Sequence, residues 1–161
     1  MSIFFVSFVL LAELASLSWL IVAVWLGGDS LVPSQIRPAV MSILFGGIGG
    51  CAYCLRGVYL NACVRKSWDT AWLPWYGIRP FISLVFGGVS YLFVKSGLLL
   101  FNATEDPNTV GLGIWAVAFL AGFNVDKFVA KIEAVGQTVW GIDPSRQTNP
   151  VKDASHKKDK E

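Results

Sequence analysis

Two charged residues lie inside long apolar segments. Glu13 is the one charged residue of the block 3–26, and Arg56 is the one charged residue of the block 38–60. A charge at membrane depth is costly and usually faces a cavity, a partner charge or a proton path. At 1.5 Å per residue, Glu13 lies about 20 Å and Arg56 about 27 Å from the turn that joins the two blocks. The sequence therefore predicts either a structural ion pair between them or an ion or proton site that uses one or both.

Cys51 and Cys54 stand three residues apart on one face of the second block. Redox and metal sites use this spacing, but no histidine or further cysteine lies at the local spacing of a zinc site. A buried cysteine most often packs as a small hydrophobic side chain. We therefore expect packing here, with no metal and no cofactor. The sequence has no P-loop, no dinucleotide fingerprint and no nucleophile paired with a histidine, so an enzyme is not expected.

Glycines mark the expected places of close helix packing. They are Gly46, Gly47, Gly49, Gly50, Gly87 and Gly88. The step from Gly46 to Gly50 is a Gly-x-x-x-Gly pattern, which lets a second helix approach closely in lipid, either within the chain or between copies. The stretches 36–47 (IRPAVMSILFGG) and 78–88 (IRPFISLVFGG) also resemble each other. They suggest a repeat whose copies cross the membrane in opposite directions.

The elements that must position these residues follow from composition. The 161 residues are 54% hydrophobic and 15% charged, with mean hydropathy +0.56, which excludes a disordered chain and disfavours a soluble fold. The apolar residues form blocks long enough to cross a bilayer. We predict an all-α membrane protein whose residues 1–124 form a bundle. Its four transmembrane helices are expected at about 3–26, 38–60, 80–101 and 107–124.

Two details of this bundle rest on local sequence. The segment 64–79 mixes tryptophans with basic residues, which predicts an interfacial connection. Pro80 is then expected to open the third span. The fourth block is short, so it either crosses with help from residues beyond Phe123 or forms a re-entrant helix.

The C-terminal part is expected to be cytoplasmic. Residues 125–141 predict an amphipathic helix, and residues 142–161, which are polar and contain two prolines, predict a disordered tail. The helix carries apolar residues at alternating gaps of three and four, the pattern of a coiled-coil seam. They are Val125, Phe128, Ile132, Val135 and Val139. The alternative is a helix lying on the inner leaflet, with Trp140 as an anchor.

Charge sets the expected orientation. Arg65, Lys66, Arg79, Lys127 and Lys131 fall on one side of the predicted spans, whereas Arg37 is the one basic residue in the opposite loops. The positive-inside rule then places both termini in the cytoplasm of a multi-pass inner-membrane protein.

Three motifs carry a resemblance to known proteins. With WYGIRP at 75–80, FGG at 86–88 and FLAGF at 119–123, residues 72–130 resemble a group of small, uncharacterised bacterial inner-membrane proteins. The resemblance implies a bacterial membrane helical protein and implies no activity. The segment LLAEL at 10–14 is also similar to the first helix of small multidrug-resistance transporters. In that family an acidic residue binds a proton and a cationic drug, which would be the role of Glu13 here.

Two functions are consistent with these patterns. One is a narrow ion or small-solute pathway formed by a homo-oligomer, because the predicted spans hold too few polar residues for a wide pore. The other is a non-conducting accessory or scaffold subunit that presents its C-terminal helix to an unidentified protein partner. The lipid bilayer is the expected surrounding in both, and nothing in the sequence indicates a nucleic-acid partner.

Overall fold

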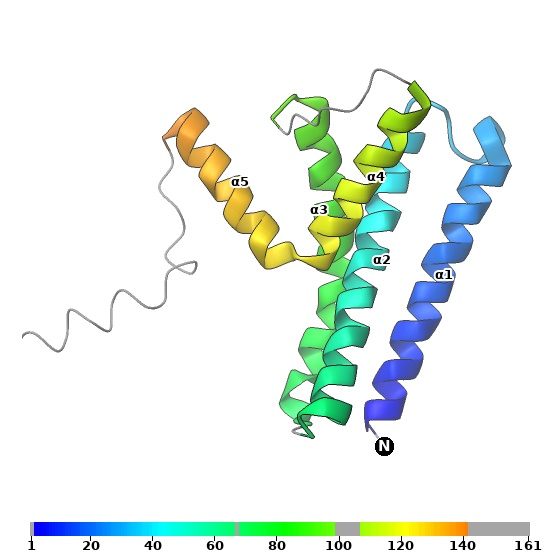
Figure 1. The fold of residues 1–161 in the computed structure, drawn as a ribbon. Coiled ribbons are helices and arrows are strands. Elements are labelled where there is room, and N and C mark those ends of the chain that lie inside the picture. The colour runs from blue at the N-terminus through cyan, green and yellow to red at the C-terminus, as the bar shows by residue number, and fades with distance from the viewer. Residues whose placement is uncertain (1, 67, 99–106, 142–161) are drawn as a thin grey trace, which may run out of the picture. The chain divides into compact units, whose positions relative to one another are not determined.

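The structure, a computed structural model, describes residues 2–66, 68–98 and 107–141. The described residues form helices joined by short connections and contain no strand, which confirms the all-α prediction (Figure 1). Its elements are α1 (Ser2–Leu31), α2 (Arg37–Tyr59), the π-helix η1 (Leu60–Val64), the 3-10 helix η2 (Thr70–Trp72), α3 (Leu73–Lys95), α4 (Pro107–Phe123) and α5 (Val125–Trp140). The expected disordered tail, residues 142–161, lies outside the described residues.

Within the described ranges, three helical segments are long and apolar enough to cross a membrane: Ile3–Leu31, Arg37–Val64 and Thr70–Lys95. The short helix α4 meets the same test only when it is taken together with α5 as one broken span. The chain therefore has the architecture of a polytopic membrane protein with three or four candidate spans. It forms two compact units, Met1–Val125 and Asp126–Glu161, and the first holds the helical bundle.

The third span starts earlier than predicted. Pro80 was expected to open it, but α3 begins at Leu73 and Pro80 lies buried in its interior. Two features start the helix earlier. The Asp69 side chain accepts a hydrogen bond from the Ala71 N–H at 2.9 Å and caps η2. Pro74 occupies the first turn of α3, where its missing N–H costs nothing. Pro80 leaves one helical hydrogen bond unmade, and the packed surroundings of α3 accommodate that loss.

The third span also ends earlier than the predicted residue 101. Helix α3 stops at Lys95, and Gly97 follows with a φ of 76°. The N–H of Leu98 donates to the Phe93 carbonyl at 3.0 Å, and the N–H of Gly97 donates to the Val94 carbonyl at 3.1 Å. This pair of bonds around a left-handed glycine is a Schellman stop, so local chemistry ends the helix before its apolar sequence does.

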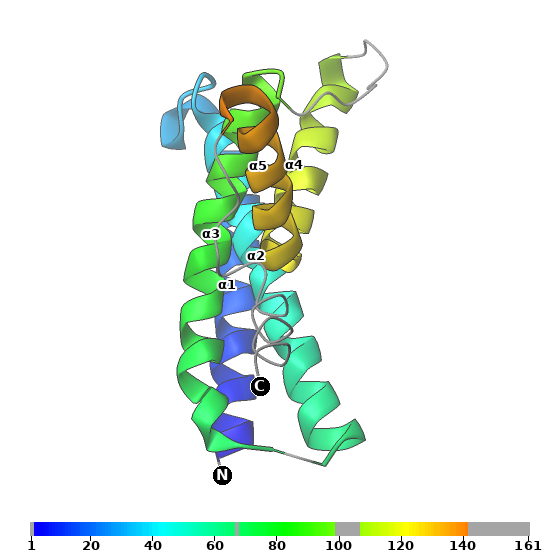
Figure 2. The ribbon, with the colours of Figure 1, turned by 90° about the vertical axis from the view of Figure 1, so that its left-hand side faces the viewer.

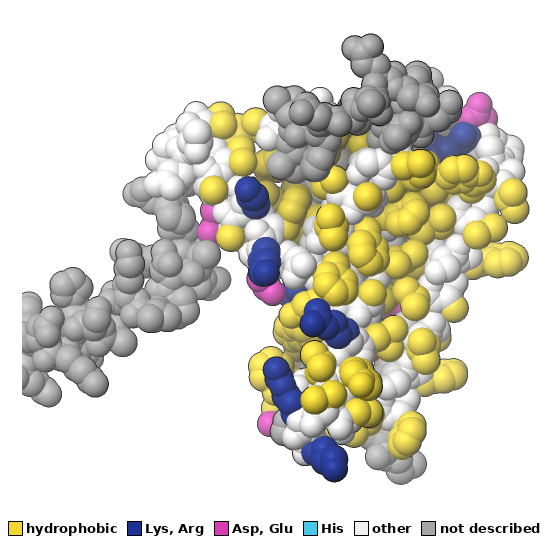
Figure 3. All heavy atoms as spheres, viewed as in Figure 1, with side chains coloured by type: hydrophobic (Ala, Val, Ile, Leu, Met, Phe, Trp, Pro, Cys, Tyr) yellow, Lys and Arg dark blue, Asp and Glu magenta, His cyan; other side chains and the backbone are white. Residues whose placement is uncertain are grey.

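Helix α2 is the centre of the bundle. It packs against α1, α3 and α4, and α3 packs against α4 as well. Figures 1 and 2 show α1, α2 and α3 alongside one another for most of their length, whereas α4 covers only part of α2. Much of α1 is left facing outward, with Phe4, Phe5 and Trp19 more than two-thirds exposed, as expected for side chains that meet lipid. The space-filling view shows the same apolar surface (Figure 3).

Glycines bring the backbones of α2, α3 and α4 into contact. A Cβ added to Gly46 would lie 2.6 Å from the Gly87 Cα and 2.6 Å from the Ser83 carbonyl oxygen. A Cβ on Gly122 of α4 would overlap the Gly46 backbone, and a Cβ on Gly49 would overlap the backbone of Phe119. Small residues of this kind allow the close approach that stabilises helix packing in lipid.

The other predicted packing glycines also contact neighbouring helices of the same chain. An added Cβ would meet Ser83 at Gly50, Leu84 and Leu17 at Gly47, Ser42 and Gly46 at Gly87, and Ile43 at Gly88. Both stretches that resemble each other in sequence hold a Ser-x-x-x-Gly step, Ser42 to Gly46 and Ser83 to Gly87. These steps pack on each other reciprocally, since each glycine faces the carbonyl of the other serine.

Candidate functional site

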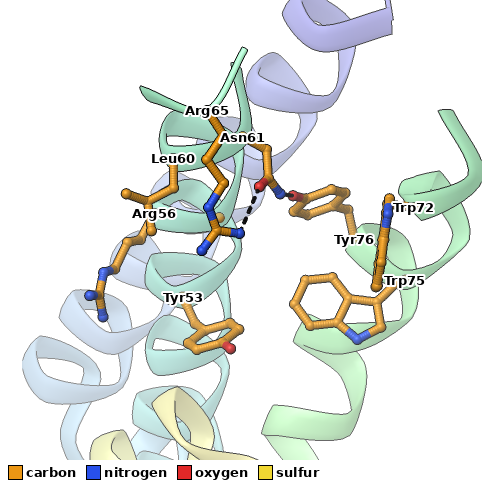
Figure 4. A pocket seen from close by; sticks show the side chains of 9 residues that line it. Tyr53, Arg56, Leu60, Asn61, Arg65, Trp72, Trp75 and Tyr76 are labelled. Carbon is orange, nitrogen blue, oxygen red and sulfur yellow. Dashed lines mark hydrogen bonds between the residues drawn. The ribbon is translucent and has the colours of Figure 1, made fainter. Parts of the chain in front are cut away.

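The short fourth helix leaves part of the bundle uncovered. Helix α4 ends at Phe123, whose ring meets the ring of Tyr53 of α2 edge-on, with centroids 5.6 Å apart. Past this contact, α2 and α3 continue without α4 and enclose a pocket of about 510 Å³, which we call the vestibule (Figure 4). It is lined by Tyr53, Arg56, Gly57, Leu60, Asn61, Arg65, Trp72, Trp75 and Tyr76.

A change of helix type shapes one wall of the vestibule. Helix α2 continues into η1, and the Arg65 N–H donates to the Leu60 carbonyl five residues earlier at 2.8 Å. A π-helical turn changes the direction of the side chains that follow it and is frequent at functional sites. Here it presents Asn61 and Arg65 to α3. The Asn61 amide donates to the Tyr76 hydroxyl at 3.2 Å, and Arg65 donates to the Asn61 carbonyl oxygen at 3.5 Å.

Aromatic rings form the opposite wall. Trp75 and Tyr76, in the first turn of α3, meet edge-on with centroids 5.2 Å apart, and Trp72 meets Trp75 edge-on at 6.4 Å. The ring of Trp68 stacks on Tyr76 at 5.8 Å. Tryptophan and tyrosine combine an apolar ring with a polar edge, which suits them to the border between lipid and water.

The buried arginine of the bundle is Arg79. From the sequence we expected this residue in an interfacial connection, but it lies in the second turn of α3 with 5% of its surface exposed. Its guanidinium carbon sits 4.8 Å from the ring centre of Tyr53 and 5.3 Å from that of Trp75, so two vestibule rings stabilise the charge by cation–π contact. The signal in the sequence was the spacing of Trp75 and Arg79, which places both on one helix face once α3 begins at Leu73.

The predicted pair of Glu13 and Arg56 does not form in the described part of the chain. Glu13 lines a groove of about 630 Å³ made by α1 and α3. Arg56 is exposed and lines the vestibule, with its guanidinium on the side away from Trp75 and Tyr76 (Figure 4). The two side chains therefore leave their helices toward different grooves.

Cys51 and Cys54 are buried free thiols within apolar clusters. Cys54 packs with Val6, Leu10 and Val58, and Cys51 packs in the cluster that holds Leu17. Across the residues that the structure describes, no group of three histidine, cysteine or acidic residues is placed to hold a metal ion. The arrangement of these two cysteines is that of packing residues.

The predicted seam residues lie on one helix, α5. Val125 is buried, Phe128, Ile132 and Val135 are half-buried, and Val139 is 51% exposed. Their part in assembly stays a prediction. No protein-family model, curated protein or solved structure matches this chain.

Proposed function

We propose that this polytopic protein resides in a bacterial inner membrane, with both termini cytoplasmic, and captures a phosphate-type anion in the vestibule. The observation that carries the proposal is the convergence on one pocket of Arg65, the Asn61 amide and the Tyr76 hydroxyl, with the buried charge of Arg79 behind two of its rings. A cationic donor and two neutral polar groups thus surround a space in which an anion would be bound.

The donor set suits phosphate. A guanidinium presents several N–H groups in a plane and binds phosphate oxygens in pairs. The Tyr76 hydroxyl accepts a hydrogen bond from Asn61, which leaves its own proton for a ligand oxygen. Arg79 adds long-range attraction without contact, because the rings of Tyr53 and Trp75 cover it. The volume of about 510 Å³ lies within the range of small-ligand sites.

The phosphate has two possible sources, a lipid headgroup and a soluble phosphate ester. The surroundings favour the lipid. The vestibule borders the end of α2 where Arg65 and Lys66 follow, and this end would be cytoplasmic under the positive-inside rule. Anionic lipids of that leaflet attract each nearby Lys or Arg with about 1 kcal/mol. Trp72 and Trp75 would hold the upper part of the acyl chains.

The same geometry bears on the two functions that the sequence suggested. A narrow pathway through one subunit would need polar groups along the span, whereas beyond Arg79 the interface of α2, α3 and α4 consists of glycines and serines in backbone contact. An accessory subunit that holds an anionic lipid is therefore the better supported function. A pathway would have to run between copies of a homo-oligomer, and a protein partner for α5 is part of the accessory proposal.

The test compares lipid-induced stabilisation in two variants. Purified protein in a neutral detergent is titrated with short-chain phosphatidylglycerol, and separately with inorganic phosphate, while the melting temperature is followed. A ligand at about 100 times its Kd adds about 2.7 kcal/mol to the free energy of unfolding. We expect wild type to be stabilised and Arg65→Gln to lose most of that shift. Lys95→Gln, which removes an exposed cation at the far end of α3, is the matched control and should behave as wild type.

Each outcome is informative. Stabilisation by phosphatidylglycerol alone identifies a lipid headgroup, and equal stabilisation by inorganic phosphate identifies a soluble anion. Equal shifts in wild type and Arg65→Gln, or no shift in wild type, would remove the vestibule from consideration as an anion site.

A further inference from the structure

Glu13 and Arg56 are opposite charges, the first half-buried in a groove and the second exposed. The Glu13 carboxylate lies in the groove between α1 and α3, and the Arg56 side chain is exposed on α2. Neither forms an ion pair within the described residues. Because a lone charge at membrane depth is expensive and such residues usually pair, each is a strong candidate for a partner outside its own subunit.

Their depths in the bundle match. Val6 and Leu10 of α1 share one packed cluster with Cys54 and Val58 of α2, so Arg56 lies near the level midway between Val6 and Leu10. Glu13 is about five residues further along α1, which corresponds to about 7–8 Å at 1.5 Å per residue. An extended arginine side chain together with a glutamate side chain spans that difference. In two copies that cross the membrane in the same direction, these groups would be in reach of each other.

Part of the groove around Glu13 is lined by small residues. Its small residues are Ala12 and Ser16 of α1, one turn apart, and Gly77 of α3. All three are exposed, and a Cβ placed on Gly77 would meet nothing within 4 Å. Small residues on an open face let a neighbouring helix approach closely, which is how helices associate in lipid. The remaining lining is apolar apart from Glu13 and Tyr76, so a helix carrying one cation complements it.

We propose that the groove between α1 and α3 receives the Arg56 face of α2 from a second copy of this chain, with Glu13 of one copy paired to Arg56 of the next. The contact joins two different surfaces, so it is heterologous and closes into a ring when the rotation between copies permits. Arg56 also lines the vestibule, with its guanidinium on the side away from Trp75 and Tyr76 (Figure 4). Arg65 and Asn61 take no part in the pairing and stay available for the anion of the proposed function.

The test exchanges the charges between copies. Glu13→Arg and Arg56→Glu are each prepared with two different affinity tags. Copies of the same variant, or of the two variants, are produced together, and association is measured by recovery of one tag with the other in nanodiscs. Either variant alone sets like charges across the contact, whereas a contact between one copy of each variant joins opposite charges at positions 13 and 56. We expect mixed recovery to exceed self-association at least about tenfold, a difference of about 1.4 kcal/mol. Lys95→Glu, which changes an exposed charge at the end of α3 and keeps both Glu13 and Arg56, is the matched control and should self-associate as wild type does.

Folding and lipid binding are followed in the same samples. Glu13→Gln, which removes the charge without reversing it, should weaken wild-type association while helical content stays unchanged. Mixed recovery no greater than self-association, or a wild-type mass of one subunit, would overturn the proposal and leave lipid chains as the occupant of the groove. Stabilisation by phosphatidylglycerol is compared between wild type and Arg65→Gln, both of which keep Glu13 and Arg56, so either proposal can fail without the other.

Discussion

Gly122→Ala on α4 is the sharpest probe of the close-packed interface. A Cβ at this position would lie 2.6 Å from the carbonyl carbon and 2.8 Å from the Cα of Gly46 on α2. Those are backbone atoms of a central helix, so no side chain can rotate aside to make room. Carbon atoms pack best at about 3.5–4.0 Å, so the two helices would have to separate locally by about 1 Å.

The free-energy cost has three parts. Forcing an extra carbon into a packed interface costs about 1–3 kcal/mol. The separation also strains the buried hydrogen bond in which the Ser83 hydroxyl donates to the Gly122 carbonyl at 3.0 Å, and an interhelical bond of this kind contributes on average about 0.6 kcal/mol in a membrane protein. Replacing a helical glycine with alanine stabilises the helix by about 1 kcal/mol, because alanine has the higher helix propensity. We therefore expect a net loss of about 0.5–2.5 kcal/mol in the free energy of unfolding.

The assay is reversible unfolding in mixed micelles of a mild detergent and dodecyl sulfate, followed by circular dichroism. Gly113→Ala is the control, because Gly113 lies on the same helix and a Cβ there would meet nothing within 4 Å. It should leave stability unchanged or raise it by up to about 1 kcal/mol. Equal effects of the two substitutions would refute the argument that backbone contact between α2 and α4 stabilises this bundle.

Three further outcomes are expected. Tyr53→Leu removes one of the rings that cover Arg79 and should lower the free energy of unfolding by about 0.5–2 kcal/mol, whereas Tyr53→Phe, which keeps the ring, should cost less in the same unfolding assay. Asp29→Asn breaks an ion pair with Arg37 whose carboxylate side is 73% exposed, so the melting temperature should change by the equivalent of at most about 1 kcal/mol. A reporter enzyme that is active only outside the inner membrane should give signal when fused after Ser34 and none when fused after Asp69; the reverse pattern would invert the proposed orientation.

Hydropathy determined that the main elements are long apolar helices, of which three are long enough to span a membrane in the described residues. Each apolar block must satisfy its backbone internally in lipid, and a helix is the way a single segment does so. The same reasoning located the packing glycines such as Gly46 and Gly87, because only residues without a large side chain permit contact between helix backbones. These features depend on local composition, which the linear sequence contains in full.

The residue at which the third span begins could not be predicted from local composition. Two prolines, Pro74 and Pro80, both offered a helix start, and hydropathy favoured the second. The structure uses the first, because Asp69 caps the preceding turn and the packed bundle accommodates Pro80 inside α3. That shift of about two turns moved Arg79 from an expected interface into the buried part of the bundle.

The tertiary structure also decided which charges meet. Spacing along a helix determines the depth of Glu13 and Arg56 in a membrane, but not the direction in which each side chain leaves its helix. That direction depends on how every helix is rotated against its neighbours, and for α2, α3 and α4 the glycine contacts constrain the rotation. Depth alone suggested a pair within one subunit. The packing instead turned Glu13 toward the groove of α1 and α3, left Arg56 exposed, and buried Arg79 against Tyr53 and Trp75.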